Sequence, residues 1–214
     1  MTNLQKRILT SIIILPVSFF FIIKGGYFLL FFLLSVFFVA NFELFSVFNN
    51  KATILFLDLI LILSLFSIYY LSDTSERLNL LLWVIILVIC SDVGGYAFGK
   101  IFKWKKLTNI SPKKTLSGVF GSFIFSLFSL FIASAIVHNT GMYVNINFLE
   151  PKFFFLAIIL SLIAQIGDLT ISYFKRDEKI KDTGKILPGH GGILDRIDGI
   201  LIGVPIGALL SLLL

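Results

Sequence analysis

The chain has 214 residues, of which 57% are hydrophobic and only 14% are charged, and its formal net charge is +6. Soluble domains carry about a quarter charged residues, so this composition argues against a soluble globular protein, and disorder is excluded because it requires low hydrophobicity. A disulfide scaffold within the chain is excluded as well, because Cys90 is the single cysteine.

Seven apolar runs follow one another along the chain, each near the length of about 20 residues that one helical crossing of a bilayer requires. The runs are residues 8–23, 27–48, 52–71, 78–99, 117–137, 153–174 and 193–213. Helices are expected because a lone strand would leave its backbone polar groups unpaired in lipid. No small-x-small cleavage site follows the first run, so we expect a retained helix rather than a signal peptide. The predicted fold class is an all-α, polytopic integral membrane protein with about seven transmembrane helices.

Basic residues are divided unequally between the two sets of alternate loops. Fourteen of the 18 Lys and Arg residues lie before the first run or after the second, fourth and sixth runs, whereas three lie in the other set. Because cytoplasmic loops are enriched in Lys and Arg, we expect the N-terminus and both large loops to lie in the cytoplasm. This topology accounts for the net charge without a nucleic-acid partner.

Chemically distinctive residues are concentrated in the second part of the chain. Residues 1–77 are apolar and chemically plain, whereas residues 78–214 hold most of the glycines, prolines and charged residues that have a candidate role. We therefore predict N-terminal transmembrane helices over 1–77, followed by a catalytic transmembrane region with cytoplasmic loops over 78–214.

Seven ionisable residues lie within the apolar runs, where each costs several kcal/mol unless it is paired or hydrated. Glu43 and Asp58 stand alone near the ends of their runs, and a snorkelling or interhelical hydrogen-bonded carboxyl accounts for each. The other five gather near the ends that are expected on the cytoplasmic side, and they are Asp92, Asp168, Asp195, Arg196 and Asp198.

Helical spacing sorts these residues onto shared faces. Asp195 and Asp198 are three positions apart, and a second stripe on the preceding run consists of Ser161, Gln165, Asp168 and Ser172. Asp92 begins a third stripe with Tyr96 and Gly99. Carboxylates that converge from three helices favour a divalent cation, and Mg²⁺ is the usual one where phosphates also bind. A structural cluster of the acids with Arg196 and loop lysines is the alternative.

Two basic loops border these acids. One reads Ser111-Pro112-Lys113-Lys114-Thr115, and the other contains Lys175-Arg176, Lys181-Asp182 and Pro188-Gly189-His190-Gly191-Gly192. Glycines allow a ligand to approach the backbone closely, and Lys and Arg neutralise phosphate oxygens. Basic loops above intramembrane carboxylates therefore indicate a site for a phosphoanhydride and a metal ion.

From Ser172 the sequence reads SYFKRDEKIKDTGKILPGHGGILDRIDG. It resembles, at every fixed position, the signature S-x-x-K-R-x4-K-D-x-G-x3-P-G-H-G-G-x-x-D-R-x-D of the phosphatidate cytidylyltransferase (CDP-diacylglycerol synthase) family. Residues 91–100 and 111–115 are similar to two further family blocks, so the resemblance covers residues 88–200 strongly. One departure is Ser117, which stands where the family usually has Glu.

The resemblance implies transfer of the cytidylyl group of CTP to phosphatidic acid, giving CDP-diacylglycerol and pyrophosphate. The implied catalytic residues are Asp168, Asp195, Lys175, Arg176 and Arg196. The implied ligands of Mg²⁺ are Asp168, Asp195, Asp198 and Asp92, with room for a second, monovalent cation such as K⁺. The implied substrate-binding residues are Ser111, Lys113, Lys114, Thr115, Ser172, Lys181, Asp182, Gly189, His190, Gly191 and Gly192.

The expected setting follows from the same resemblance. The partners would be CTP, phosphatidic acid, the lipid bilayer and a second copy of the chain in a homodimer. The expected location is a bacterial inner membrane, with the active site facing the cytoplasm.

Three rival functions remain open. Another CTP-dependent membrane lipid kinase or nucleotidyltransferase would share the basic loops but give other products. A small cation or proton transporter would use Asp92, Asp168 and Asp195 as a relay, and would distribute its acids through the depth of the bilayer. An inactive relative is suggested by Ser117.

Overall fold

The structure is a computed structural model that describes residues 3–108, 111–140, 146–184, 186–187 and 191–212. These residues form α-helices joined by short connections, and within them strand-like pairing is limited to two isolated bridges, Lys106–Thr115 and Leu187–Gly191. The helices are α1 (Asn3–Lys24), α2 (Gly26–Val47), α3 (Lys51–Leu71), α4 (Ser75–Phe102), α5 (Leu116–Thr140), α6 (Pro151–Asp177) and α7 (Leu194–Ser211). The all-α prediction is confirmed, and each expected run corresponds to one of these helices.

Local sequence signals explain several helix ends. The Asn50 side chain accepts a hydrogen bond from the backbone N–H of Ala52 over 2.9 Å and so caps the start of α3. Pro151 occupies the first turn of α6, where its missing N–H would be unpaired in any case. Lys103 ends α4 in the left-handed conformation, with φ of 49°. The helices therefore begin and end within a few residues of the apolar runs.

Among the residues that the structure describes, five helices are long and apolar enough to cross a membrane, namely α2 to α6. In α1 the apolar part, Ile12–Lys24, is shorter, and in α7 three charged residues interrupt the first turns. The chain is therefore a polytopic membrane protein, whereas the expected number of seven crossings stays a prediction.

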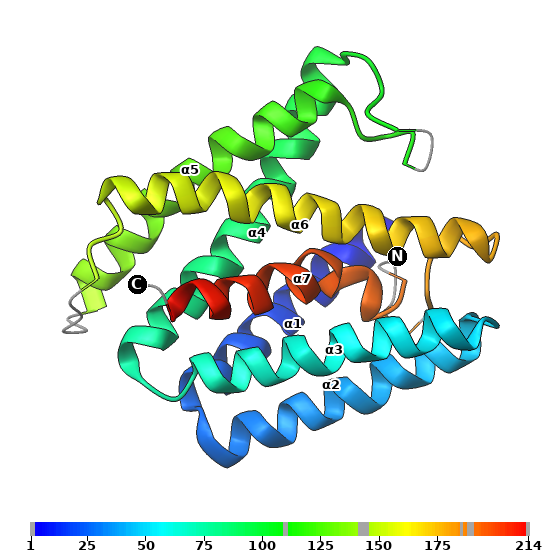
Figure 1. The fold of residues 1–214 in the computed structure, drawn as a ribbon, viewed down its shortest axis with the longest axis horizontal. Helices are drawn as coiled ribbons and strands as arrows, with labels where there is room; N and C mark the ends of the chain where they lie inside the picture. Colours follow the sequence, from blue (N-terminus) through cyan, green and yellow to red (C-terminus); the bar gives the residue numbers. More distant parts are fainter. Residues whose placement is uncertain (1–2, 109–110, 141–145, 185, 188–190, 213–214) are drawn as a thin grey trace.

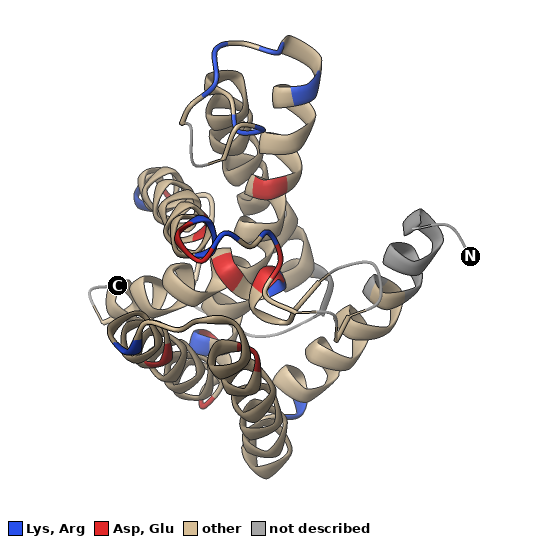
Figure 2. Ribbon diagram, turned by 90° about the vertical axis from the view of Figure 1, so that its right-hand side faces the viewer, with Lys and Arg blue, Asp and Glu red and all other residues tan. Residues whose placement is uncertain are grey.

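The helices form a bundle in which successive connections lie at opposite ends (Figure 1). The connections between α2 and α3, α4 and α5, and α6 and α7 lie at the right of that view, and the intervening ones lie at the left. Helix α7 packs against α3, α4 and α6, while α4 and α5 pack along each other. Seen from that end, Lys, Arg, Asp and Glu gather around the connections and the adjoining helix turns (Figure 2).

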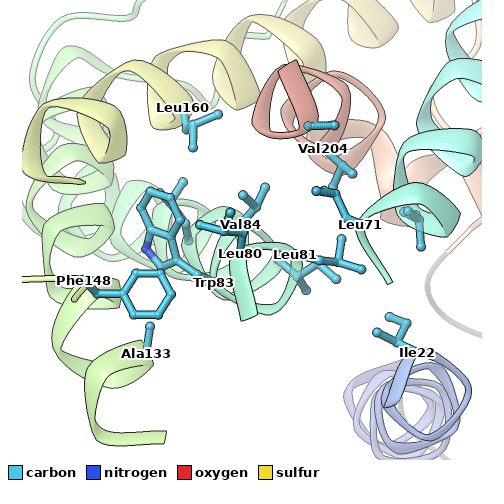
Figure 3. Close-up of a cluster of buried hydrophobic side chains, with 14 of the residues drawn as sticks. Ile22, Leu71, Leu80, Leu81, Trp83, Val84, Ala133, Phe148, Leu160 and Val204 are labelled. Atoms are coloured by element: carbon cyan, nitrogen blue, oxygen red, sulfur yellow. The ribbon is translucent and has the colours of Figure 1, made fainter. Parts of the chain in front are cut away.

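The hydrophobic core is built around Trp83 of α4 (Figure 3). Its ring meets Phe153 edge-on at 5.4 Å and Phe148 at 5.6 Å, measured between ring centroids. The same buried cluster includes Leu29 and Leu33 from α2 together with residues of α4 to α7. Helices from before and after residue 77 thus share one hydrophobic cluster. The division of the chain into an N-terminal part and a catalytic part stays a prediction.

Candidate active site

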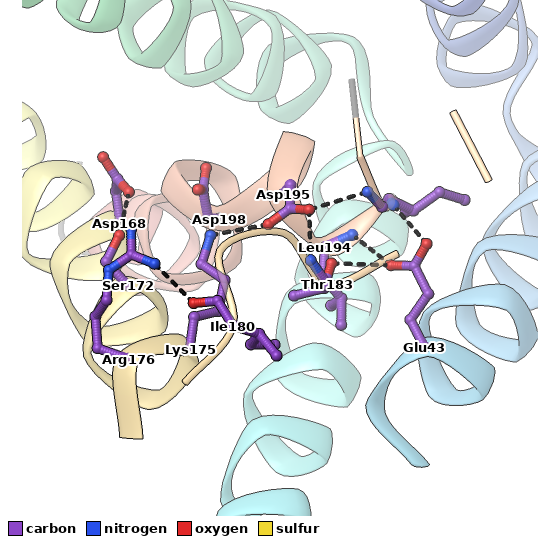
Figure 4. A network of polar contacts seen from close by, with 12 residues as sticks. Glu43, Asp168, Ser172, Lys175, Arg176, Ile180, Thr183, Leu194, Asp195 and Asp198 are labelled. Carbon is purple, nitrogen blue, oxygen red and sulfur yellow. Dashed lines mark hydrogen bonds and ion pairs between the residues drawn. The ribbon is translucent and has the colours of Figure 1, made fainter. Parts of the chain in front are cut away.

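Asp195 lies in the first turn of α7 and accepts three hydrogen bonds (Figure 4). Lys175 of α6 donates from Nζ to Oδ1 over 2.8 Å, while the backbone N–H groups of Thr183 and Gly192 donate to Oδ2 over 2.7 and 2.9 Å. The side chains of Lys175 and Asp195 are only 8% and 4% exposed. A carboxylate offers about four lone-pair directions, so this arrangement ties α6 to α7 and leaves room for one further partner.

Asp168 lies two turns before Lys175 on α6 and binds a residue of the lysine-rich loop, the connection between α4 and α5 over residues 103–115. It forms an ion pair with Lys114, whose Nζ also donates to the carbonyl oxygen of Gln165 over 3.4 Å. Ser172 donates from Oγ to Asp168 Oδ1 over 3.3 Å. The loop before α5 is thus held against α6 at the position that the sequence predicted for phosphate binding.

Asp92 of α4 and Asp198 of α7 complete a group of carboxylates from three helices. Asp198 is close enough to Asp168 and Asp92 for mutual electrostatic repulsion. Lys175 opposes that repulsion at Asp198, and Lys114 and Arg196 oppose it at Asp92. Asp92, Asp168 and Asp198 therefore lie within electrostatic reach of one another, whereas Asp195 is bound separately by Lys175 and two N–H groups.

The chemistry of this group suits Mg²⁺, which binds a few carboxylate oxygens and keeps positions for water and phosphate. Within the described residues, no three His, Cys, Asp or Glu side chains are already grouped tightly enough to enclose a metal ion. Lys114 is paired with Asp168 in the structure. A metal ion at Asp168 would therefore bind beside the ammonium group of Lys114 or displace it. The metal role of Asp92, Asp168, Asp195 and Asp198 stays a prediction.

Buried serine hydroxyls join α4, α5 and α6 in the interior of the bundle. The Oγ atoms of Ser91 and Ser161 are 2.9 Å apart, and Ser122 donates to the carbonyl oxygen of Ser91 over 2.8 Å. Gln165 donates to the carbonyl oxygen of Ser161 over 3.3 Å. Ser161, Gln165, Asp168 and Ser172 are linked in part by these i, i+4 contacts, as expected for one face of α6.

The remaining basic candidates have different environments. Arg176 donates to the carbonyl oxygen of Ile180 over 2.6 Å and so stabilises the connection after α6. The other charged candidates are solvent-exposed and thus accessible to a ligand, namely Lys113, Lys181, Asp182 and Arg196.

The small residues of the predicted loops are also placed in part. Thr115 Oγ1 lies 2.9 Å from the hydroxyl of Ser117, and it accepts a hydrogen bond from the N–H of Gly118 over 3.1 Å. Ser117 is therefore buried and contacts Thr115 of the lysine-rich loop. The residue that stands where the family usually has Glu thus has a structural contact of its own. Ser111 is half-buried in the same loop, where its carbonyl oxygen accepts a hydrogen bond from the N–H of Lys114 over 3.0 Å. Gly191 has φ of 90°, which favours glycine, whereas Gly189 and His190 lie outside the described residues.

The structure adds one residue to those that the sequence selected. Glu43 of α2 accepts hydrogen bonds from the N–H groups of Ile193 and Leu194 over 2.8 and 3.1 Å, and from the Thr183 hydroxyl over 3.3 Å. The expectation of an interhelical hydrogen-bonded carboxyl is confirmed for Glu43. Its contact with the start of α7 was not predictable, because the partners are about 150 residues away along the chain.

Comparison with known proteins places this geometry in a family. A sequence model described as "Cytidylyltransferase family" matches residues 48–214. A phosphatidate cytidylyltransferase of Helicobacter pylori is 40% identical over 126 residues, which cover 58% of this chain and 43% of that protein.

Two staphylococcal proteins are similar over a longer stretch. A phosphatidate cytidylyltransferase of Staphylococcus epidermidis is 38% identical over 139 residues, and one of Staphylococcus aureus is 40% identical over 140 residues. Each match covers 64% of this chain and 51% of the relative. The chain thus spans about half the length of the curated relatives that it matches.

Proposed function

Because the chain belongs to the cytidylyltransferase family, we propose that it transfers the cytidylyl group of CTP to phosphatidic acid, giving CDP-diacylglycerol and pyrophosphate. The observation that carries this proposal is the pairing of Lys114 with Asp168 and of Lys175 with Asp195 at one end of the bundle, where the basic loops also lie (Figure 2). This arrangement can hold a metal-bound triphosphate where an aqueous nucleotide and a membrane lipid can both reach it.

In the proposed reaction, an oxygen of the lipid phosphate forms a bond to the α-phosphorus of CTP. The bond from that phosphorus to the bridging oxygen breaks, and pyrophosphate leaves with the electron pair. The attacking oxygen is already an anion near neutral pH, so the protein has to neutralise charge and align the reactants rather than supply a strong base.

Basic side chains would supply most of this neutralisation. Lys114, on the loop before α5, and Lys175, at the end of α6, each pair with a carboxylate, and Lys113 and Arg176 are their neighbours along the chain. Arg196 acts electrostatically on Asp92 and is itself exposed. We assign the triphosphate and the lipid phosphate to these cations, with hydrogen bonds from Ser111, Thr115 and Ser172.

Asp168, Asp195, Asp198 and Asp92 are the proposed ligands of Mg²⁺, which would polarise the phosphate oxygens when bound. A second, monovalent cation such as K⁺ belongs to the same proposal. We further propose that the active site faces the cytoplasm of a bacterial inner membrane, that the protein works as a homodimer, and that nucleic acid is not a partner.

The decisive experiment incubates the purified full chain in detergent with labelled CTP, Mg²⁺ and phosphatidic acid. The expected products are a CDP-lipid and pyrophosphate in equal amounts, and neither should form when the divalent cation is chelated. A phosphorylated lipid together with CDP would instead identify a CTP-dependent lipid kinase. Absence of both products with folded protein would indicate an inactive relative and overturn the proposal.

A further inference from the structure

Glu43 connects α2 to the segment that joins α6 and α7. Its side chain belongs to a residue that is only 1% exposed, and its two carboxylate oxygens accept from Thr183, Ile193 and Leu194. Thr183 lies inside the segment, six residues after the end of α6, and the other two partners lie where the segment meets α7. Glu43 therefore joins an inner residue of that segment to its α7 end. It does so from outside the residues that the family model matches, which begin at residue 48.

The partners of this carboxylate are neutral groups. Within the described residues no Lys or Arg forms an ion pair with Glu43. Two of its three hydrogen bonds come from N–H groups at the start of α7, where the helix dipole favours a negative charge. A buried carboxylate is costly unless such groups satisfy it, so the position of Glu43 and the position of the α7 N-terminus depend on each other.

Two glycines make this contact sterically possible. A Cβ atom on Gly192 would overlap Glu43 Oε2 and the Thr183 hydroxyl, and a Cβ atom on Gly184 would lie 2.8 Å from Glu43 Oε1. Neither glycine has a positive φ, so the φ angle does not require glycine at either position. Close approach of the Glu43 carboxylate, rather than an unusual backbone angle, accounts for glycine at these two positions.

The same two parts of the segment also hold Asp195. Its Oδ2 accepts from the N–H groups of Thr183 and Gly192, and Figure 4 shows Glu43 and Asp195 on opposite sides of Thr183. Thr183 thus donates its backbone N–H to one carboxylate and its hydroxyl to the other. A displacement of Glu43 would be transmitted through these shared groups to Asp195 and then to Lys175.

We infer that Glu43 is a positioning residue of the active site, which sets the placement of Asp195 and Lys175 by joining Thr183 to the start of α7. This inference rests on the proposed function. Groups that orient metal or phosphate ligands typically change activity or metal affinity by about 10–100-fold when they are replaced. We expect a change of that size for Glu43→Gln, which keeps the shape but loses the charge and one acceptor.

The test compares Glu43→Gln and Glu43→Asp with the control Asp58→Asn, which changes the other carboxylate that the sequence places alone in its run. Hydrogen–deuterium exchange should become faster at the amides of Thr183, Gly192, Ile193 and Leu194 in Glu43→Gln, and stay unchanged in Asp58→Asn. CDP-lipid formation should fall about 10–100-fold, and the Mg²⁺ concentration for half-maximal activity should rise about tenfold. Glu43→Asp, which keeps the charge, should recover part of both.

Normal activity and an unchanged Mg²⁺ requirement in Glu43→Gln would overturn the inference, even if exchange became faster. If Glu43→Gln does not fold, Thr183→Val replaces it, because it removes only the hydroxyl contact. A several-fold loss of CDP-lipid formation in Thr183→Val would then support the inference, and full activity would overturn it. A wild-type protein that forms no CDP-lipid would defeat the proposed function instead, while the exchange measurement would still decide whether Glu43 clamps the segment.

Discussion

At the scale of single residues, the site is organised by two lysine–carboxylate pairs in different surroundings. The pair of Lys175 and Asp195 is buried, whereas Lys114 and Asp168 are each about a quarter exposed. A buried charge is costly when its partner is removed, so the first pair has a larger structural role. The second pair is accessible, which suits a lysine that exchanges a carboxylate for a phosphate during binding.

Replacing Lys175 with Ala should destabilise the protein, because Asp195 would keep only N–H donors in a buried position. Breaking a buried ion pair costs about 3–5 kcal/mol, whereas an exposed pair contributes about 0–1 kcal/mol. Lys152→Ala is the matched control, since Lys152 and Glu150 are 49% and 43% exposed. Thermal unfolding in detergent should give a clearly lower midpoint for Lys175→Ala alone. Equal midpoints would contradict a structural role for the pair.

Asp168→Asn and Asp195→Asn should each lower turnover by orders of magnitude while the protein still inserts, because each removes charge from the proposed metal site. Glu150→Gln, at the opposite end of the bundle, should leave turnover unchanged. Turnover would be measured as CDP-lipid formed per folded protein, with membrane insertion checked by extraction. Near-normal rates in both Asn variants would refute the metal assignment.

At the scale of helices, α4 and α5 approach closely because glycines face each other along the contact. A Cβ atom on Gly95 would lie 2.7 Å from Ser122 Oγ, and one on Gly118 would lie 2.9 Å from the carbonyl oxygen of Gly95. Small residues allow helices to pack closely in a membrane, where the hydrophobic effect between helices is weak. This contact also positions the lysine-rich loop, which connects the end of α4 to the start of α5.

Gly94→Ala should weaken the pairing of α4 and α5, because a Cβ atom there would overlap the carbonyl oxygen of Gly121 and lie 2.7 Å from Phe125 Cγ. Overpacking of this kind costs about 1–3 kcal/mol. The control is Gly203→Ala, whose new Cβ atom would meet Val88 Cγ2 at an ordinary 3.4 Å. Thermal unfolding in detergent should separate the two variants, and an equal loss in both would show that the close approach is not responsible.

We expect a second helix contact to depend on pH. Glu178, directly after α6, accepts hydrogen bonds from the backbone N–H and the side-chain amide of Asn49, both over 2.9 Å, and these lower its pKa below the ordinary 4.5. Because its pKa is lower in the folded protein, the contact stabilises fully above the unfolded-state value and is lost as pH falls through the folded value. The turn between α2 and α3 should therefore loosen from α6 only in acid.

Glu178→Gln should accordingly be less stable than the wild type at neutral pH, with a difference that shrinks toward zero below about pH 4. The measurement is the thermal midpoint of both proteins in detergent across this pH range. A difference of constant size at every pH would mean that the charge of Glu178 does not contribute.

At the scale of the whole molecule, the connections alternate between two ends of the bundle, and the lysine-rich ones share one end (Figures 1 and 2). That end also holds the carboxylates of α4, α6 and α7 together with Glu43. A transporter relay would distribute its acids along the bilayer depth, whereas here they form one group beside basic loops. The arrangement instead suits a reaction at the membrane surface.

The proposed sidedness predicts the outcome of cysteine labelling in a Cys90→Ser background. Lys106→Cys, on the lysine-rich loop, should be protected from a membrane-impermeant thiol reagent in intact cells, whereas Lys152→Cys should react. Both positions are exposed lysines, so reactivity after permeabilisation serves as the control. Labelling of Lys106→Cys in intact cells would place the active site on the outer face.

The sequence by itself determined the helices, their order, the unequal charge of the two loop sets and most candidate residues of the site. These features are local, because hydropathy, helix caps and the spaced residues from Ser172 to Asp198 are each contained in one stretch of chain. It could not determine which cation meets which carboxylate, since Lys114 and Asp168 are neighbours only after α5 packs against α6. Tertiary structure alone decided that Glu43 of α2 clamps the start of α7, because that contact exists only once helices from the two ends of the chain share one bundle.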